Sequence, residues 1–114
     1  MIASISSISI GNPSIKIQNI GQHHVIHSDY EYSNSDMNVA SKILVENSIS
    51  SVICLNSNYA GGELIFPDDG ISIDLKAGSA CVFTSAGNRH GVTEVTGGVR
   101  YSLLNFGEVI YNEL

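Results

Sequence analysis

Positive charge is scarce in this sequence. Of its 114 residues, five are basic and eleven are acidic, which gives a formal net charge of −6. No two basic residues are neighbours, so the chain offers no basic stripe that could follow a phosphate backbone or an anionic membrane surface. We therefore expect neither nucleic acid nor a membrane as a partner. An anionic small ligand would need one well-placed cation, and the candidates are Lys16, Lys42, Lys76, Arg89 and Arg100.

Sulfur and long apolar runs are also scarce. Cys54 and Cys81 each lie within a short apolar run, and two such thiols predict reduced core residues rather than a disulfide framework. Residues 1–10 alternate Ile with Ser and lack the basic start and continuous apolar stretch of a signal peptide. No run approaches the length that spans a membrane. We expect a reducing, cytoplasmic setting.

The length fits one domain that spans residues 1–114. A hydrophobic fraction of 43% is enough for a modest core. Small domains bury a smaller share of their surface than large ones, so a bound metal or a partner subunit would add needed stability.

What the chain does have is a period of two along short apolar segments. These segments are rich in Val, Ile and aromatic residues, and they cover residues 51–55, 63–66, 71–75, 80–83, 90–95 and 99–106. Turn signals separate them at residues 60–62, 67–70, 77–78, 86–88 and 96–98. Short strands at this spacing predict an all-β sandwich or jelly-roll barrel.

One segment could form a helix. Residues 36–46 begin with Asp36 as a candidate N-cap and place Val39, Ile43 and Leu44 on one side. The surrounding residues 30–38 are polar and rich in Ser and Asn, so we favour a long mobile loop followed by a strand.

A candidate metal site begins at His27 and Asp29. In a strand, residues two apart project to the same face, so an imidazole and a carboxylate could bind one ion. The alternative is a strand end whose side chains form local hydrogen bonds. His90 favours the metal, because it opens a predicted strand directly after a Gly-Asn turn. Two histidines and one carboxylate leave coordination positions open, as in non-haem Fe(II) oxygenases, whereas structural zinc sites are closed.

Arg100 is the second candidate site residue. By alternation it shares a face with Ser102, Leu104 and Phe106. A buried guanidinium needs an anion, and its planar fork suits a carboxylate, to which Ser102 could donate a further hydrogen bond. The alternative is an arginine at the barrel rim, or one paired with an acidic side chain.

Taken together, these residues resemble the core of the prolyl 4-hydroxylase-like branch of the 2-oxoglutarate and Fe(II)-dependent oxygenase superfamily. The resembling segments run in order from about residue 18 to residue 106, and they are residues 21–29, 54–56, 58–67, 76–83 and 90–103. The resemblance implies a double-stranded β-helix, a jelly-roll or cupin-like barrel with little or no helix.

The resemblance also implies roles for individual residues. His27, Asp29 and His90 would hold Fe(II), and Arg100 would bind the far carboxylate of the cosubstrate 2-oxoglutarate. Ser102 would assist Arg100. The residues that would line the cosubstrate pocket are Val92 and Leu64.

The activity implied is that of a dioxygenase, which consumes O2 and 2-oxoglutarate, releases succinate and CO2, and hydroxylates its substrate. That substrate would be a prolyl residue in a peptide or protein, or a small molecule, and the resemblance leaves room for ascorbate as a further cofactor. Residues 30–47 would form a loop over the mouth of the site.

The chain departs from the family in two respects. Gln18 and Cys54 stand where the family often has tyrosines that contact the cosubstrate, and glutamine can donate a hydrogen bond there while a thiol does so only weakly. Family members usually carry N-terminal helices over the larger sheet, whereas about twenty residues precede the strand of His27 here. We therefore expect another chain on that face, as in a homodimer, or a minimal barrel.

Two other functions stay open. A cupin-like metal-binding barrel would keep the three metal ligands and use Arg100 structurally. A degenerate oxygenase fold would be a non-catalytic interaction domain. His23 and His24 are interpreted as surface or pocket-wall residues, and His24 stands where the family often has an aromatic side chain.

Overall fold

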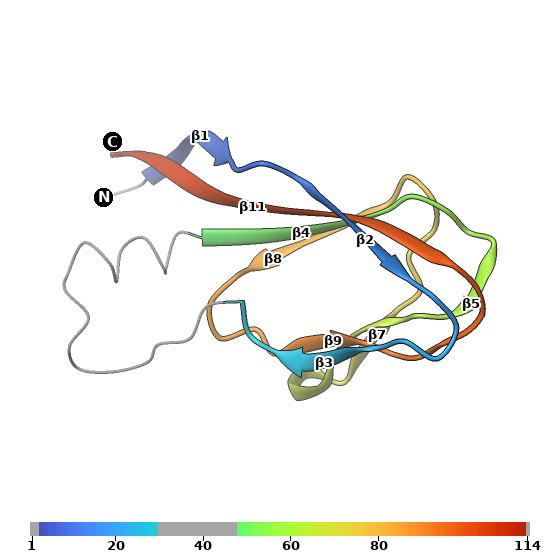
Figure 1. Ribbon diagram of the computed structural model, residues 1–114. Helices are drawn as coiled ribbons and strands as arrows, with labels where there is room; N and C mark the ends of the chain where they lie inside the picture. The colour runs from blue at the N-terminus through green and yellow to red at the C-terminus, as the bar shows by residue number, and fades with distance from the viewer. Residues whose placement is uncertain (1–2, 30–47, 114) are drawn as a thin grey trace.

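The computed structural model describes residues 3–29 and 48–113, which form two antiparallel sheets facing one another (Figure 1). The larger sheet has the order β1-β11-β4-β8, with β2 also paired to β11. Its strands are β1 (Ala3–Ile10), β2 (Ser14–Gln18), β4 (Ser48–Cys54), β8 (Ala80–Thr84) and β11 (Arg100–Glu113). The smaller sheet has the order β3-β9-β6-β7. Its strands are β3 (His24–His27), β6 (Leu64–Phe66), β7 (Ile71–Ile73) and β9 (His90–Val92).

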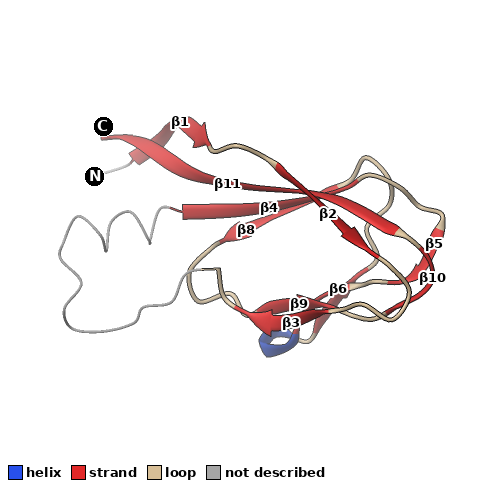
Figure 2. Ribbon diagram, viewed as in Figure 1, coloured by secondary structure: helices blue, strands red, loops and turns tan. Residues whose placement is uncertain are grey.

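This arrangement confirms the predicted all-β, jelly-roll class. A two-stranded ladder of β5 (Tyr59–Gly61) and β10 (Val95–Gly98) joins the sheets at one end. Apart from one 3-10 turn, η1 (Pro67–Asp69), the described residues are strand and loop (Figure 2). Among them, no helix is long and apolar enough to cross a membrane.

The core lies between the two sheets and follows from the period of two. Along β4, every second residue from Ser48 to Cys54 is buried. The apolar residues of this strand meet the smaller sheet in a cluster of Val52, Cys54, Leu64, Phe66, Leu75 and Val92. The two cysteines are free, with Cys54 fully buried and Cys81 half-buried, so Cys54 is the core thiol that the sequence predicts. Burial raises the pKa of the Cys81 thiol.

Strand β11 is the spine of the larger sheet and is longer than the predicted strand at residues 99–106. On one edge it pairs first with β2 and then with β1, and on the other with β4. The predicted alternation along its first half is confirmed at its start, where Arg100 and Ser102 are buried and Tyr101 is 40% exposed.

Three local predictions were wrong at the β5–β10 ladder. The strand expected at residues 90–95 ends at Val92, and the two segments expected as turns, residues 60–62 and 96–98, are largely paired with one another. The reason is a bulged register between Val95 and Gly97, with Gly61 and Gly98 at positive φ. Glycine can hold such a conformation within a ladder, so its turn signal was misread.

The helix considered at residues 36–46 and the loop expected at residues 30–47 lie outside the described residues. The outer face of the larger sheet carries exposed isoleucines, with Ile15 65% and Ile17 55% exposed. Ile17 stands opposite Tyr101 in the register, so this face is apolar across two neighbouring strands. Its coverage by a second copy stays a prediction.

Candidate metal and cosubstrate site

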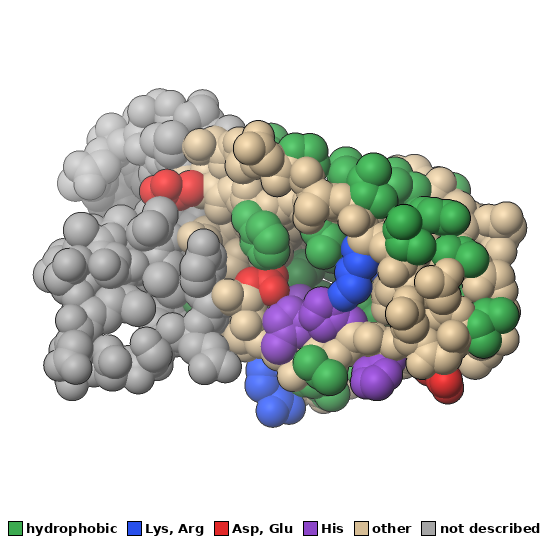
Figure 3. All heavy atoms as spheres, in the orientation of Figure 1, with side chains coloured by type: hydrophobic (Ala, Val, Ile, Leu, Met, Phe, Trp, Pro, Cys, Tyr) green, Lys and Arg blue, Asp and Glu red, His purple; other side chains and the backbone are tan. Residues whose placement is uncertain are grey.

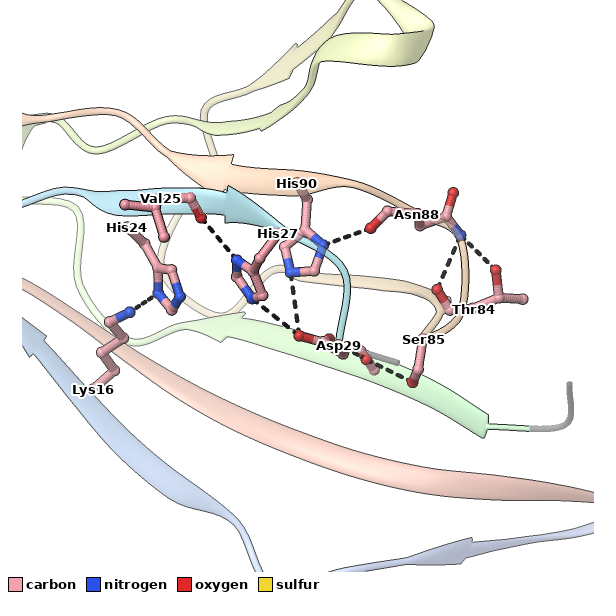
Figure 4. Close-up of polar contacts among 10 residues, drawn as sticks. Lys16, His24, Val25, His27, Asp29, Thr84, Ser85, Asn88 and His90 are labelled. Atoms are coloured by element: carbon pink, nitrogen blue, oxygen red, sulfur yellow. Dashed lines mark hydrogen bonds and ion pairs between the residues drawn. The ribbon is translucent and has the colours of Figure 1, made fainter. Parts of the chain in front are cut away.

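His27, Asp29 and His90 meet at one point between the sheets (Figure 4). His27 ends β3 and His90 opens β9, and the two stand opposite one another in the register. Asp29 lies in the bend after β3 and not within a strand as expected, yet its carboxylate faces both rings. Its Oδ1 is 3.1 Å from Nε2 of His27 and 3.6 Å from Nε2 of His90.

The ring orientation of both histidines is fixed by the backbone. His27 donates its Nδ1 proton to the carbonyl of Val25 at 2.7 Å, and His90 donates its own to the carbonyl of Asn88 at 2.8 Å. The Nε2 atom of each ring therefore points at the carboxylate of Asp29. Two imidazole nitrogens and a carboxylate oxygen that face one another suit a cation, and backbone bonds of this kind are how proteins orient metal-binding histidines.

The carboxylate of Asp29 is held from its other side. Ser50 of β4 donates a hydrogen bond of 2.5 Å to Oδ2, and the hydroxyls of Ser50 and Ser85 are 2.7 Å apart. Both serines are at most 2% exposed. Oδ1 is thereby left to point at the histidines.

The spacing fits one divalent ion. The three candidate ligand atoms lie within 4.8 Å of one another. Ligands at right angles on an ion about 2.1 Å away are roughly 3 Å apart, close to the 3.1 and 3.6 Å from Asp29 to the two histidines. The rings of Phe66 and Phe83 flank His90, with centroids 5.8 and 4.6 Å from its own. The residues therefore suit a metal with two histidines and one carboxylate, and the cluster opens into a pocket.

Arg100 lies in the same pocket and is 2% exposed. Its Nη1 donates to Oε1 of Gln18 at 2.7 Å and to the hydroxyl of Ser102 at 3.2 Å. Both partners are neutral, and none of the described residues forms an ion pair with Arg100. Its Nε and the Nε2 of Gln18 are buried without a hydrogen-bond partner. A buried cation in this state favours an anionic ligand.

The stem of Arg100 crosses Gly62, whose φ is +63°. A Cβ at Gly62 would lie 2.8 Å from Cδ of Arg100. The absence of a side chain at Gly62 therefore leaves room for the side chain of Arg100 in the pocket.

Cys54 and Tyr59 lie beside this cluster. The Cys54 thiol is within 3.4 Å of the Tyr59 hydroxyl, which donates to the carbonyl of Leu75 at 3.3 Å. Burial, together with the Cys54 thiol, raises the pKa of Tyr59 to about 12, and Arg100 acts in the opposite direction. The resemblance expects a tyrosine at the position of Cys54. Tyr59 of β5 brings a tyrosine hydroxyl close to that position.

The remaining predicted pocket residues are also brought together. Leu64 and Val92 stand opposite one another in the register of β6 and β9, and both line the pocket. Both side chains also belong to the hydrophobic core, so they pack against the core and line the pocket at the same time.

Sequence reasoning assigned no role to three residues of this site. Lys16 of β2 lines the pocket, and alternation along β2 gave no correct signal for it. Ile15 and Ile17 are exposed in the structure, so that Lys16 and Gln18 face inward. Ser50 gave no signal because it contacts Asp29 across 21 residues. Tyr59 was part of a resembling segment without a role of its own.

The fold and the site together define a class: a double-stranded β-helix with a two-histidine, one-carboxylate cluster at a pocket. No family model matches the chain, and no curated protein matches it. Among solved structures, it is similar to the viral collagen prolyl hydroxylase vCPH from Paramecium Bursaria Chlorella virus-1, in its 2OG complex. The TM-score is 0.72 at 16% identity, over 93% of this chain and 63% of that one.

Two bacterial structures are similar as well. An oxidoreductase of the 2OG-Fe(II) oxygenase family from Burkholderia pseudomallei has a TM-score of 0.67 at 22% identity, over 90% of this chain and 45% of that one. A prolyl-4-hydroxylase from Pseudomonas putida has a TM-score of 0.64 at 22% identity, over 96% of this chain and 55% of that one. At these identities the shared property is the fold, and this chain spans 45% to 63% of the length of these neighbours.

Proposed function

We propose that this chain is an Fe(II)- and 2-oxoglutarate-dependent oxygenase. The observation that carries the proposal is the buried Arg100, without a carboxylate partner among the described residues, in the pocket that also contains His27, Asp29 and His90. A 2-oxo acid with a second carboxylate matches both features, because one end can chelate a metal while the other meets a guanidinium.

Each residue then has a defined task. His27, Asp29 and His90 would hold iron, with Ser50 keeping the carboxylate of Asp29 in place. Arg100 would bind the far carboxylate of 2-oxoglutarate, and Ser102 and Gln18 would fix the orientation of its guanidinium. Leu64 and Val92 would form apolar walls that exclude water from the reacting groups.

Bound iron supplies the oxidation, in which O2 and 2-oxoglutarate give succinate, CO2 and a hydroxylated substrate. We propose a prolyl residue of a peptide or protein as the substrate, or else a small molecule. Two of the similar structures are prolyl hydroxylases, which supports the first choice. Self-association through the exposed outer face of the larger sheet is part of the same proposal.

The decisive experiment measures 2-oxoglutarate binding to the chain loaded with Mn(II), which avoids turnover. Calorimetry on the parent protein, on Arg100→Met and on Arg89→Met separates the two arginines. Arg89 is the matched control because it is exposed and paired with Asp68 at 3.1 Å. We expect Arg100→Met to weaken binding by about thirtyfold or more, since it removes the charged partner of a buried carboxylate.

Succinate release by the Fe(II)-loaded chain in air is the second readout. Binding that Arg100→Met leaves unchanged would favour the cupin-like metal-binding barrel. Strong, Arg100-dependent binding with no succinate formed from any offered substrate would favour a non-catalytic oxygenase fold.

A further inference from the structure

Lys16 occupies the same pocket as Arg100 but lies nearer its mouth. It is half-buried in β2, where it stands opposite Ser102, and its ammonium contacts Nδ1 of His24 (Figure 4). The His24 ring in turn stacks on His27 with centroids 4.3 Å apart. Figure 3 shows a basic side chain beside the histidines on the surface between the two sheets. Lys16 therefore reaches from the outside toward the candidate metal cluster.

Lys16 differs from the exposed basic residues of the described chain in its lack of a carboxylate partner there. Of the basic residues that the structure describes, the two outside the pocket are each paired with a carboxylate: Lys76 with Asp74 at 2.9 Å, and Arg89 with Asp68 at 3.1 Å. Lys16 and Arg100 both line the pocket, and neither forms such a pair with a described residue. Among the described residues, the cations without a carboxylate partner are thus gathered in one place.

The described lining of the pocket offers Lys16 no free carboxylate. Asp29 is the one carboxylate among the described lining residues, and it is engaged by His27 and Ser50. Burial, and then the nearby Arg100, lower the pKa of Lys16, so its positive charge is less stable in the pocket than in water. An anion beside it would relieve both effects.

We propose that Lys16, together with His24, binds a carboxylate group of the substrate at the mouth of the pocket. The inference rests on the proposed function and narrows it to substrates that carry an acid group close to the position that is oxidised. A carboxylate could also come from the cosubstrate. The substrate is favoured because Arg100, at 2% exposure, already provides the deeper cation, whereas Lys16 is half-exposed and touches the ring stacked on His27.

The test compares two probes that differ in one charge, N-acetylglycine and its neutral amide. Each is titrated into the chain loaded with Mn(II) and 2-oxoglutarate, and broadening of the acetyl proton signal by Mn(II) reports binding near the metal. We expect the acid to bind about tenfold more tightly than the amide, as for a charge-assisted hydrogen bond. Lys16→Met should abolish this preference, and Lys16→Arg should retain it.

Lys76→Met is the matched control, because Lys76 is exposed and already paired with Asp74, and it should leave the preference unchanged. Equal binding of acid and amide by the parent protein overturns the proposal. So does a preference that survives Lys16→Met.

The cosubstrate arm measures the affinity for 2-oxoglutarate and for 2-oxovalerate, which lacks the far carboxylate. We expect Lys16→Met to change either affinity by less than about threefold. A tenfold loss confined to 2-oxoglutarate would assign Lys16 to the cosubstrate and overturn the proposal. If the parent chain binds neither Mn(II) nor 2-oxoglutarate, the proposed function fails by itself. In that case N-acetylglycine and its neutral amide are titrated into the metal-free chain, and the backbone amide chemical shifts report whether the acid binds beside Lys16.

Discussion

The side-chain oxygen of Gln18 accepts a 2.7 Å hydrogen bond from Nη1 of Arg100, which lies 82 residues further along the chain. The two residues stand opposite one another in the β2–β11 register, and both are 2% exposed. Gln18 thus acts as an acceptor for the arginine, while its Nε2 donor is buried without a partner. That donor is free for a ligand, so donation by Gln18 to the cosubstrate stays a prediction.

Replacement of Gln18 by Leu should therefore affect both stability and ligand binding. It leaves a buried guanidinium with one fewer partner, and we expect the free energy of unfolding to fall by about 1–3 kcal/mol. Affinity for 2-oxoglutarate should fall about tenfold, because Arg100 loses its fixed orientation. Urea denaturation and calorimetry measure the two effects. Gln22→Leu is the control, since Gln22 is exposed and its oxygen caps only a local turn; equal losses in both variants would argue against a role for the Gln18–Arg100 bond.

A pair of glycine substitutions isolates the place of Arg100. Gly62→Ala and Gly70→Ala introduce the same side chain at φ values of +63° and +65°, so both should cost about 1 kcal/mol of stability. At Gly62 the new Cβ would also lie 2.8 Å from Cδ of Arg100, whereas at Gly70 nothing lies within 4 Å. Only Gly62→Ala should weaken 2-oxoglutarate binding in addition. Equal affinities of the two variants for 2-oxoglutarate would show that binding does not depend on the position of the Arg100 side chain.

The support of Asp29 can be tested at Ser50. Ser50→Ala removes the hydrogen bond to Oδ2, and we expect the affinity for Mn(II) to fall by about 10- to 100-fold, as is usual when a ligand loses its orienting partner. Ser72→Ala is the control, because Ser72 also donates to a carboxylate, that of Glu63, but on the surface. A metal titration that gives one affinity for parent and Ser50→Ala would contradict the orienting role.

The metal ligands themselves are tested by His90→Ala. We expect it to abolish stoichiometric binding of Mn(II) or Fe(II), measured by metal analysis after gel filtration, because two ligands hold such ions weakly. His23→Ala provides the control, since His23 is exposed and outside the three-residue cluster. Retention of one equivalent of metal by His90→Ala would refute the assignment.

Much of this site followed from local rules. A strand period of two placed Arg100 and Ser102 on one face of β11, and the structure buries both of them. The chemistry of two histidines and a carboxylate identified His27, Asp29 and His90 before their convergence was visible, although the bend that holds Asp29 was taken for strand. The β5–β10 ladder was missed because a glycine at positive φ serves both a turn and a bulged strand pair.

The sequence by itself determined the all-β class and pointed to the three candidate metal ligands and Arg100, because alternation and residue chemistry act over a few positions. Only the tertiary structure decided which groups support them. Gln18 meets Arg100, Ser50 meets Asp29, and Lys16 meets His24 through strand register and sheet-on-sheet packing. These contacts depend on how strands far apart in the chain are paired, and no local pattern specifies that pairing.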